Sequence, residues 1–217
     1  MVAPSGEARA ELLDHLAQLE LETATYRVLH RRGQGWNQAR YGAMETASTT
    51  MAQYSLVVVP GLLQTADYAR EMLAKVGPGI PDPAGLVAGR MQRQQVLYDT
   101  SKRFAFVIAE GVLTTRVASS AVMLGQIDRI ASLATGLDHI ELRILPLGVS
   151  PERITMTGFV LLDDQALVET DRTEIPVRDP RDVEWYREAF DGLRRSALHG
   201  QEAVGLLRRI GATYSET

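Results

Sequence analysis

The sequence contains no cysteine, which excludes disulfide bonds and thiolate chemistry. Lysine occurs only at Lys75 and Lys102, beside many arginines, which indicates codon bias from a GC-rich genome. The 23 basic and 27 acidic residues give a formal net charge of −4. The chain therefore lacks the positive excess of a strongly basic nucleic-acid-binding module, and we expect no direct nucleic-acid binding by this chain.

Long hydrophobic runs are also missing. No run approaches the length of a membrane span, and residues 1–7 lack the basic-then-apolar pattern of a signal peptide. Together with the absence of cysteine, this predicts a cytoplasmic protein that does not associate with membranes. The 217 residues, 45% of them apolar, suffice for one sizeable domain or for a domain with a helical appendage.

The sequence lacks the common catalytic and metal-binding motifs. It has no HExxH, no GxSxG, no P-loop and no GxGxxG. Its four histidines are far apart and show no metal-ligand spacing: His15, His30, His139 and His199. The sequence therefore predicts no metal site and no cofactor.

Residues 57–70 are the stretch around which the chain is organised. An apolar, strand-like segment at residues 54–59 runs into Pro60 and Gly61. Proline cannot donate a backbone hydrogen bond and glycine tolerates unusual backbone angles, so the strand should end there. Thr65 is then a plausible N-cap for the following helix. On the properties of these residues alone, the pattern predicts a corner between a strand and a helix.

Hydrophobic periodicity along the whole chain predicts an α+β fold. Helices are expected at residues 7–32, 36–51, 65–75, 84–98, 119–137 and 179–207, and strands at residues 54–59, 104–109, 139–145, 158–162, 166–170 and 173–177. Two tight links between the last three strands favour an antiparallel meander, and Pro176 favours an edge position for the last strand. We therefore expect a mostly antiparallel sheet of five or six strands, covered by helices, with long N- and C-terminal helices.

The helix at residues 84–98 carries an unusual group of polar side chains. Arg90 and Gln94 are four residues apart and share a face, and Arg93 lies between them. These side chains could contact a buried carboxylate or a ligand, or they could be surface residues. With Gln64 of the preceding corner, they are candidate ligand-binding residues.

Two glutamates at strand ends are candidate catalytic residues. Glu110 follows the apolar strand at residues 104–109, and Glu169 lies in the meander. On neighbouring strands they could share a pocket, which would raise one pKa and make a general acid. Alternatively, each pairs with an arginine, with Arg93 and Arg116 as candidates, and orients the fold. Glu110 and Arg116 are also candidate ligand-binding residues.

These residues also resemble a known family. The string Pro60-Gly61-Leu62-Leu63-Gln64-Thr65, followed by Tyr68-Ala69, resembles the hallmark of the domain of unknown function DUF5753. Further pieces occur in the expected order: Glu45, Ala47, Arg93-Gln94, Glu110, Leu113, Arg116, Gln126, Leu145-Pro146, Gly158-Phe159-Val160, Glu169, Tyr186, Phe190 and Leu193. The resemblance covers residues 36–217 and leaves residues 1–35 as an N-terminal helix.

The resemblance implies the effector half of a transcriptional regulator. In that family the domain usually follows an Xre-type, lambda-repressor-like helix-turn-helix in actinobacterial regulators. Some members are antitoxin-like, and many are encoded beside a small DUF397 partner. Residues 1–35 are too few for such a helix-turn-helix, so we expect a domain without its own DNA-binding part.

Three functions remain open from the sequence. The leading one is a regulator-type sensor and protein-binding domain that acts through a small DUF397-like protein or a small-molecule ligand. The second is a metal-independent biosynthetic enzyme that uses Glu110 or Glu169 with nearby arginines. The third is a dimerisation module built on the first and last helices, and a homodimer is expected in any case.

Overall fold

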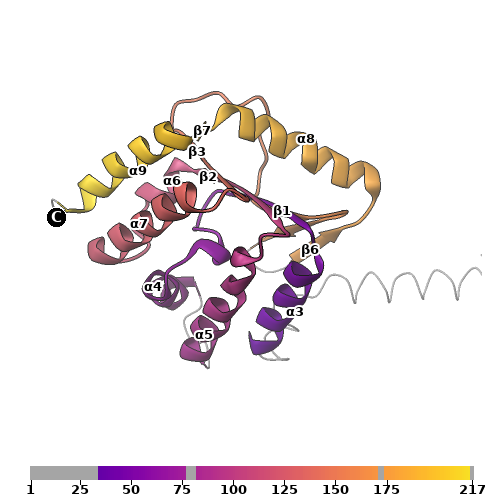
Figure 1. Cartoon of the computed structure of the whole chain (residues 1–217), viewed down its shortest axis with the longest axis horizontal. Coiled ribbons are helices and arrows are strands. Elements are labelled where there is room, and N and C mark those ends of the chain that lie inside the picture. Colours follow the sequence, from indigo (N-terminus) through magenta and orange to yellow (C-terminus); the bar gives the residue numbers. More distant parts are fainter. Residues whose placement is uncertain (1–33, 77–81, 171–173, 216–217) are drawn as a thin grey trace, which may run out of the picture.

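A seven-stranded mixed sheet forms the centre of the protein, with strand order β6-β5-β4-β1-β2-β3-β7 (Figure 1). The structure is a computed structural model that describes residues 34–76, 82–170 and 174–215. The helix predicted at residues 7–32 lies outside the described residues. The α+β class is confirmed, with at least one strand more than the sequence predicted.

The strands are β1 (Thr50–Ser55), β2 (Arg103–Ala109), β3 (Ile140–Leu145), β4 (Phe159–Leu162), β5 (Gln165–Glu169), β6 (Glu174–Val177) and β7 (Leu198–His199). β1, β2 and β3 pair in parallel, whereas β4, β5, β6 and β7 pair antiparallel with their neighbours. The meander β4-β5-β6 and the edge position of β6 with Pro176 are confirmed. The parallel half was not expected; helical connections between β1, β2 and β3 allow it, because a parallel pair needs a crossover.

The described helices are α3 (Gln34–Ala47), η1 (Gly61–Leu63), α4 (Ala66–Val76), α5 (Pro83–Arg93), η2 (Gln94–Tyr98), α6 (Glu110–Thr114), α7 (Ser120–Gly136), α8 (Pro180–Ser196) and α9 (Gly200–Ser215). Figure 1 shows α8 on one face of the sheet and α3, α4, α5 and α7 on the other. α9 packs against α7 and shares its hydrophobic core.

Alternating strand residues build two hydrophobic cores. Phe104, Phe106 and Ile108 of β2 point into the larger core, which α4, α5, α7 and α9 cover. Val107 of the same strand points to the other face, where Phe190 and other residues of α8 complete the smaller core. This alternation follows from the two-residue period of a strand.

The first strand lies four residues earlier than the sequence predicted. β1 spans Thr50–Ser55, and residues 56–58 form the bend that follows it. Asp163 fixes the start of β1, because its carboxylate accepts hydrogen bonds from the backbone N–H groups of Thr49 and Thr50. The amide of Val59 donates to the Tyr68 hydroxyl at 3.2 Å instead of to a neighbouring strand. The predicted cap is confirmed, since Thr65 Oγ1 accepts from the Tyr68 amide at 3.2 Å.

The long C-terminal helix predicted at residues 179–207 is wrong as one helix. α8 ends at Ser196, Ala197 adopts an extended conformation, and Leu198–His199 form β7 against β3. The next helix begins at Gly200, whose φ of 54° lies in the left-handed region that glycine adopts most readily. The three-and-four spacing continued through the break, so periodicity alone could not locate it.

Candidate functional site

The loop that carries the hallmark string is held by a buried glutamine. Gln64 is 2% exposed, and its Nε2 donates to the Val59 carbonyl at 2.7 Å. Its Oε1 accepts from Arg90 Nη1 at 2.5 Å. Both ends of the amide are therefore engaged, one with its own loop and one with α5.

Two further glutamines bind the backbone of the same loop. Gln94 Nε2 donates to the carbonyls of Gly61 and Gln64, at 3.0 and 2.8 Å. Gln126 of α7 donates to the Leu63 carbonyl at 2.8 Å and accepts from the Thr65 amide at 2.7 Å. The three glutamines thus satisfy backbone groups that the corner leaves without partners in a sheet or helix.

An ion pair between α3 and α5 extends this polar cluster. Arg93 Nε lies 2.9 Å from Oε2 of Glu45, which is 4% exposed. Burial raises the pKa of Glu45 to about 7, although the positive charge of Arg93 acts in the opposite direction. Burial, together with the like charge of Arg93, lowers the pKa of Arg90 to about 10.

Two carboxylates meet at the edge of the sheet. Glu169 and Glu174 lie directly opposite each other on β5 and β6. The Tyr41 hydroxyl of α3 lies 2.6 Å from Glu169 Oε1 and also donates to Glu174. Burial and the two carboxylates raise the pKa of Tyr41, so the phenol stays protonated and can donate. Arg40 forms an ion pair with Glu174.

The predicted pairing of Glu110 with Glu169 on neighbouring strands is wrong. Glu110 follows β2 and Glu169 ends β5, and β4 and β1 lie between those two strands. At the usual strand spacing this separation is about 14 Å. The carboxylate on the neighbouring strand is Glu174 instead. The sequence could not reveal it, because the order of the strands depends on how distant segments pair.

Glu110 and Arg116 lie apart from the cluster of α3, α5 and the hallmark loop. The Glu110 carboxylate accepts from the Leu147 amide at 2.7 Å. The Arg116 guanidinium lies 5.5 Å from the centre of the Tyr214 ring. Of the predicted ligand-binding residues, Gln64, Arg90, Arg93 and Gln94 come together and Glu110 and Arg116 do not join them; a ligand-binding role for any of them stays a prediction.

An open hollow, the α8-side pocket, lies on the other face of the sheet, beside α8. It has a volume of about 470 Å³ and opens to the surface. Ala52 and Ala105 lie side by side in its lining, because β1 and β2 place them in register. Leu161 and Phe190 line it at the edge of the smaller core. Sequence reasoning missed this α8-side pocket, since small residues on two strands become a hollow only when the strands pair.

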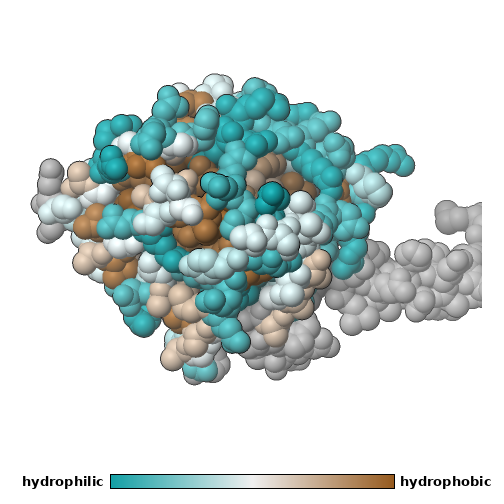
Figure 2. Space-filling model, viewed as in Figure 1, coloured by the Kyte–Doolittle hydropathy of each residue, from teal (hydrophilic) through white to brown (hydrophobic). Residues whose placement is uncertain are grey.

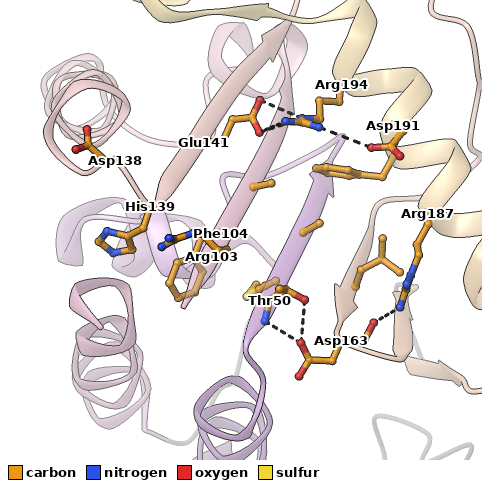
Figure 3. Close-up of a pocket in the computed structure, with 15 residues that line it drawn as sticks. Thr50, Arg103, Phe104, Asp138, His139, Glu141, Asp163, Arg187, Asp191 and Arg194 are labelled. Carbon is orange, nitrogen blue, oxygen red and sulfur yellow. Dashed lines mark hydrogen bonds and ion pairs between the residues drawn. The ribbon is translucent and has the colours of Figure 1, made fainter. Parts of the chain in front are cut away.

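Charged side chains surround the α8-side pocket, and most of them contact one another. Figure 3 shows Arg194 of α8 beside Glu141 of β3, with a shortest distance of 2.6 Å. Arg143 also pairs with Glu141, at 2.5 Å. Arg187 donates to the backbone carbonyl of Asp163, whose carboxylate caps β1. These contacts give the rim a defined shape and charge arrangement.

No group of three or more metal-ligating side chains occurs within residues 34–76, 82–170 and 174–215. Among the helices of these ranges, none combines the length and apolar character required to cross a membrane. The described part of the chain is thus an α+β domain with a buried polar cluster around residues 60–65 and an open pocket on the opposite face.

The family model described as a domain of unknown function, DUF5753, matches residues 38–209. The chain therefore belongs to the DUF5753 family, and the resemblance drawn from the hallmark string is confirmed. None of the curated proteins compared with the chain gives a significant match.

Six chains of solved structures match this one. One is TrmBL2, an archaeal chromatin protein whose structure is described as showing a novel mode of DNA binding. It is 13% identical, with a TM-score of 0.42 over 89% of this chain and 61% of that chain. The chain thus spans about three-fifths of that protein. The DNA binding in that description is said of TrmBL2, and at this similarity nothing follows from it for this chain.

Proposed function

We propose that this chain is the sensor domain of a transcriptional regulator or antitoxin-like protein and that it binds a small molecule in the α8-side pocket. The observation that carries the proposal is the pocket itself, which has about 470 Å³ and mixed apolar and charged walls. Small-molecule sites usually enclose roughly 300–1,000 Å³ and combine an apolar lining with a few polar groups. The effector role that the family resemblance implies agrees with such a site.

The contacts of the glutamates favour binding over acid–base catalysis. Glu110 binds the Leu147 amide, and Glu169 accepts from Tyr41. Glu45 faces Arg93 inside the polar cluster. These contacts support a role for each carboxylate in holding the fold together, although the partners of Glu110 and Glu169 are a backbone amide and a tyrosine and not the arginines that the sequence suggested.

For the output of the sensor, we propose binding to a small DUF397-like protein and assembly as a homodimer in the cytoplasm. The family resemblance supports the partner. Several large apolar side chains at one end of the domain are also exposed: Val57, Leu147, Val149, Ile154 and Met156. Figure 2 shows brown, apolar surface between polar regions on the face that it presents.

Native mass spectrometry of the protein purified from its own host tests the proposal. We expect a small molecule bound at fixed stoichiometry, with or without a bound small protein. Ala105→Leu, which fills the pocket, should abolish the small-molecule mass shift. Ala88→Leu is the matched control, because Ala88 is exposed on α5. Loss of the ligand from both variants, or from neither, would contradict the assignment of the pocket.

A further inference from the structure

A second hollow, of about 420 Å³, lies next to the α8-side pocket. Arg103, Asp138 and His139 line both hollows. Figure 3 shows these three residues together on the side of the pocket opposite the charged residues of α8. They come from the start of β2 and from the link between α7 and β3. The two hollows therefore adjoin at these three polar residues, and we call the pair of hollows the groove.

The hydrogen bond of His139 fixes which of its ring nitrogens is free. Its Nε2 lies 2.8 Å from the Leu97 carbonyl oxygen. A carbonyl oxygen only accepts, so Nε2 carries the proton and Nδ1 of the neutral ring is an acceptor. Nδ1 has no partner among the residues that the structure describes. The ring thus offers one acceptor at the junction of the hollows.

Asp138 adds a second acceptor, and it carries a negative charge. Its side chain is exposed and forms no ion pair within the described residues. It lies just beyond the C-terminus of α7, which ends at Gly136. The negative end of a helix dipole favours a cation at that position. All three features favour the same kind of ligand group, a positively charged donor such as an ammonium group: the carboxylate of Asp138, the ring nitrogen of His139 and the C-terminus of α7.

Arg103 provides the opposite preference at the same junction. Its Nη1 makes two long contacts of 3.3 Å with the backbone carbonyls of Thr100 and Lys102. A guanidinium has five N–H donors, so others remain for an anion. Arginine binds carboxylates in a two-pronged geometry, which makes it the suited partner of a carboxylate group.

From this geometry we infer that the groove binds a zwitterionic amino acid with an apolar side chain. The ammonium group lies between Asp138 and His139, the carboxylate binds Arg103, and the side chain covers Ala52 and Ala105. The inference rests on the proposed function and names the ligand class of the same pocket. A ligand with only one charge would match either Asp138 or Arg103, whereas a zwitterion matches both.

Isothermal titration calorimetry of the full chain with three matched probes tests the inference. L-Phenylalanine carries both charges, phenethylamine lacks the carboxylate, and 3-phenylpropionate lacks the ammonium group. We expect L-phenylalanine to bind at least about tenfold more tightly than either analogue, because each analogue lacks one charge-assisted contact. Glycine, which has no apolar side chain, should also bind more weakly.

Substitutions at the junction assign the contacts. Asp138→Asn should weaken L-phenylalanine binding without affecting 3-phenylpropionate, and Arg103→Gln should weaken it without affecting phenethylamine. Arg70→Gln is the control for a lost surface charge, since Arg70 is exposed on α4 and pairs only locally with Asp67. Thermal unfolding of each variant separates loss of contact from loss of folding.

Two results would overturn the inference. One is equal affinity for L-phenylalanine and either analogue. The other is no heat of binding with L-phenylalanine at about 10 mM, which would mean that any affinity is weaker than millimolar. In both cases a host-derived small molecule that Ala105→Leu removes would leave the sensor function standing. Absence of any such molecule would instead count against the sensor function.

Discussion

Arg93 Nε lies 2.9 Å from Glu45 Oε2, and the two side chains are only 12% and 4% exposed. This pair joins α3 to α5, and Tyr41 of α3 joins the same cluster to β5 and β6. Removing two charges from water costs free energy that their attraction only partly offsets. The main effect of the pair is therefore to fix the position of α3 against α5, and its contribution to the free energy of unfolding is small.

The raised pKa of Glu45 predicts a pH dependence. The folded-state pKa of about 7 exceeds the ordinary value of 4.5, so the folded state holds the proton more tightly. The stabilisation is complete below the unfolded pKa and is lost as the pH rises through 7. At 1.36 kcal/mol per pKa unit it amounts to at most about 3 kcal/mol.

Urea unfolding of the wild type and of Glu45→Gln, between about pH 4.5 and pH 8, measures this effect. The amide cannot ionise, so the wild type should lose free energy of unfolding relative to the variant as the pH rises. A difference that stays constant over this range would show that Glu45 keeps an ordinary pKa.

Loss of a glutamine that binds the hallmark loop should destabilise the fold. In Gln94→Leu, the carbonyls of Gly61 and Gln64 lose their donor, which should lower the free energy of unfolding by about 2–4 kcal/mol. Gln95→Leu is the matched control, because Gln95 is exposed in the next position. Chemical denaturation that gives similar values for both variants would show that the loop holds its shape without Gln94.

Removal of the Tyr41 hydroxyl should leave two carboxylates facing each other. Tyr41→Phe should cost about 1–3 kcal/mol, because Glu169 and Glu174 lose a shared donor. Glu169→Gln in the same chain should recover part of this loss, since the amide removes one charge. A double-mutant cycle by thermal unfolding measures the coupling, and purely additive effects would argue against a shared hydrogen bond. Tyr98→Phe, at an exposed tyrosine, is the control.

Two glycines should respond to alanine in opposite directions. A Cβ at Gly158 would lie 2.8 Å from the backbone oxygen of Tyr54, which cannot move without disturbing β1. Gly158→Ala should therefore lower the melting temperature. A Cβ at Gly125, inside α7, would meet nothing within 4 Å, and alanine there should stabilise the helix by about 0.5–1 kcal/mol. If Gly125→Ala also destabilised the protein, the space around Gly125 in α7 would be smaller than the structure shows.

Local signals in the sequence predicted most helices and strands. Thr65 caps α4, and Pro176 lies on the edge strand β6. The sequence placed the start of β1 and the end of α8 wrongly for the same reason, which is that contacts with distant parts of the chain determine both boundaries. Asp163, far along the chain, fixes the start of β1, and β3 draws Leu198 into a strand within an otherwise helical pattern.

The candidate sites were less predictable than the fold. The hallmark string led to Gln64, and the helix pattern led to Arg90, Arg93 and Gln94, which do form one cluster. The sequence contains no local pattern that predicts the α8-side pocket. Ala52 and Ala105 become neighbours only through the pairing of β1 with β2. Strand order is a property of the whole chain, so a hollow between strands cannot be deduced from local spacing.

The two-residue strand β7 lets the C-terminal segment pass from one face of the sheet to the other. α8 precedes it on one face, and α9 follows it on the other, against α7. β7 also covers the outer edge of β3, which would otherwise offer unpaired backbone groups to another chain. Release of this one strand would loosen both layers at once. The amide protons of α8 and α9 should therefore exchange with solvent as a single cooperative unit rather than as two independent helices.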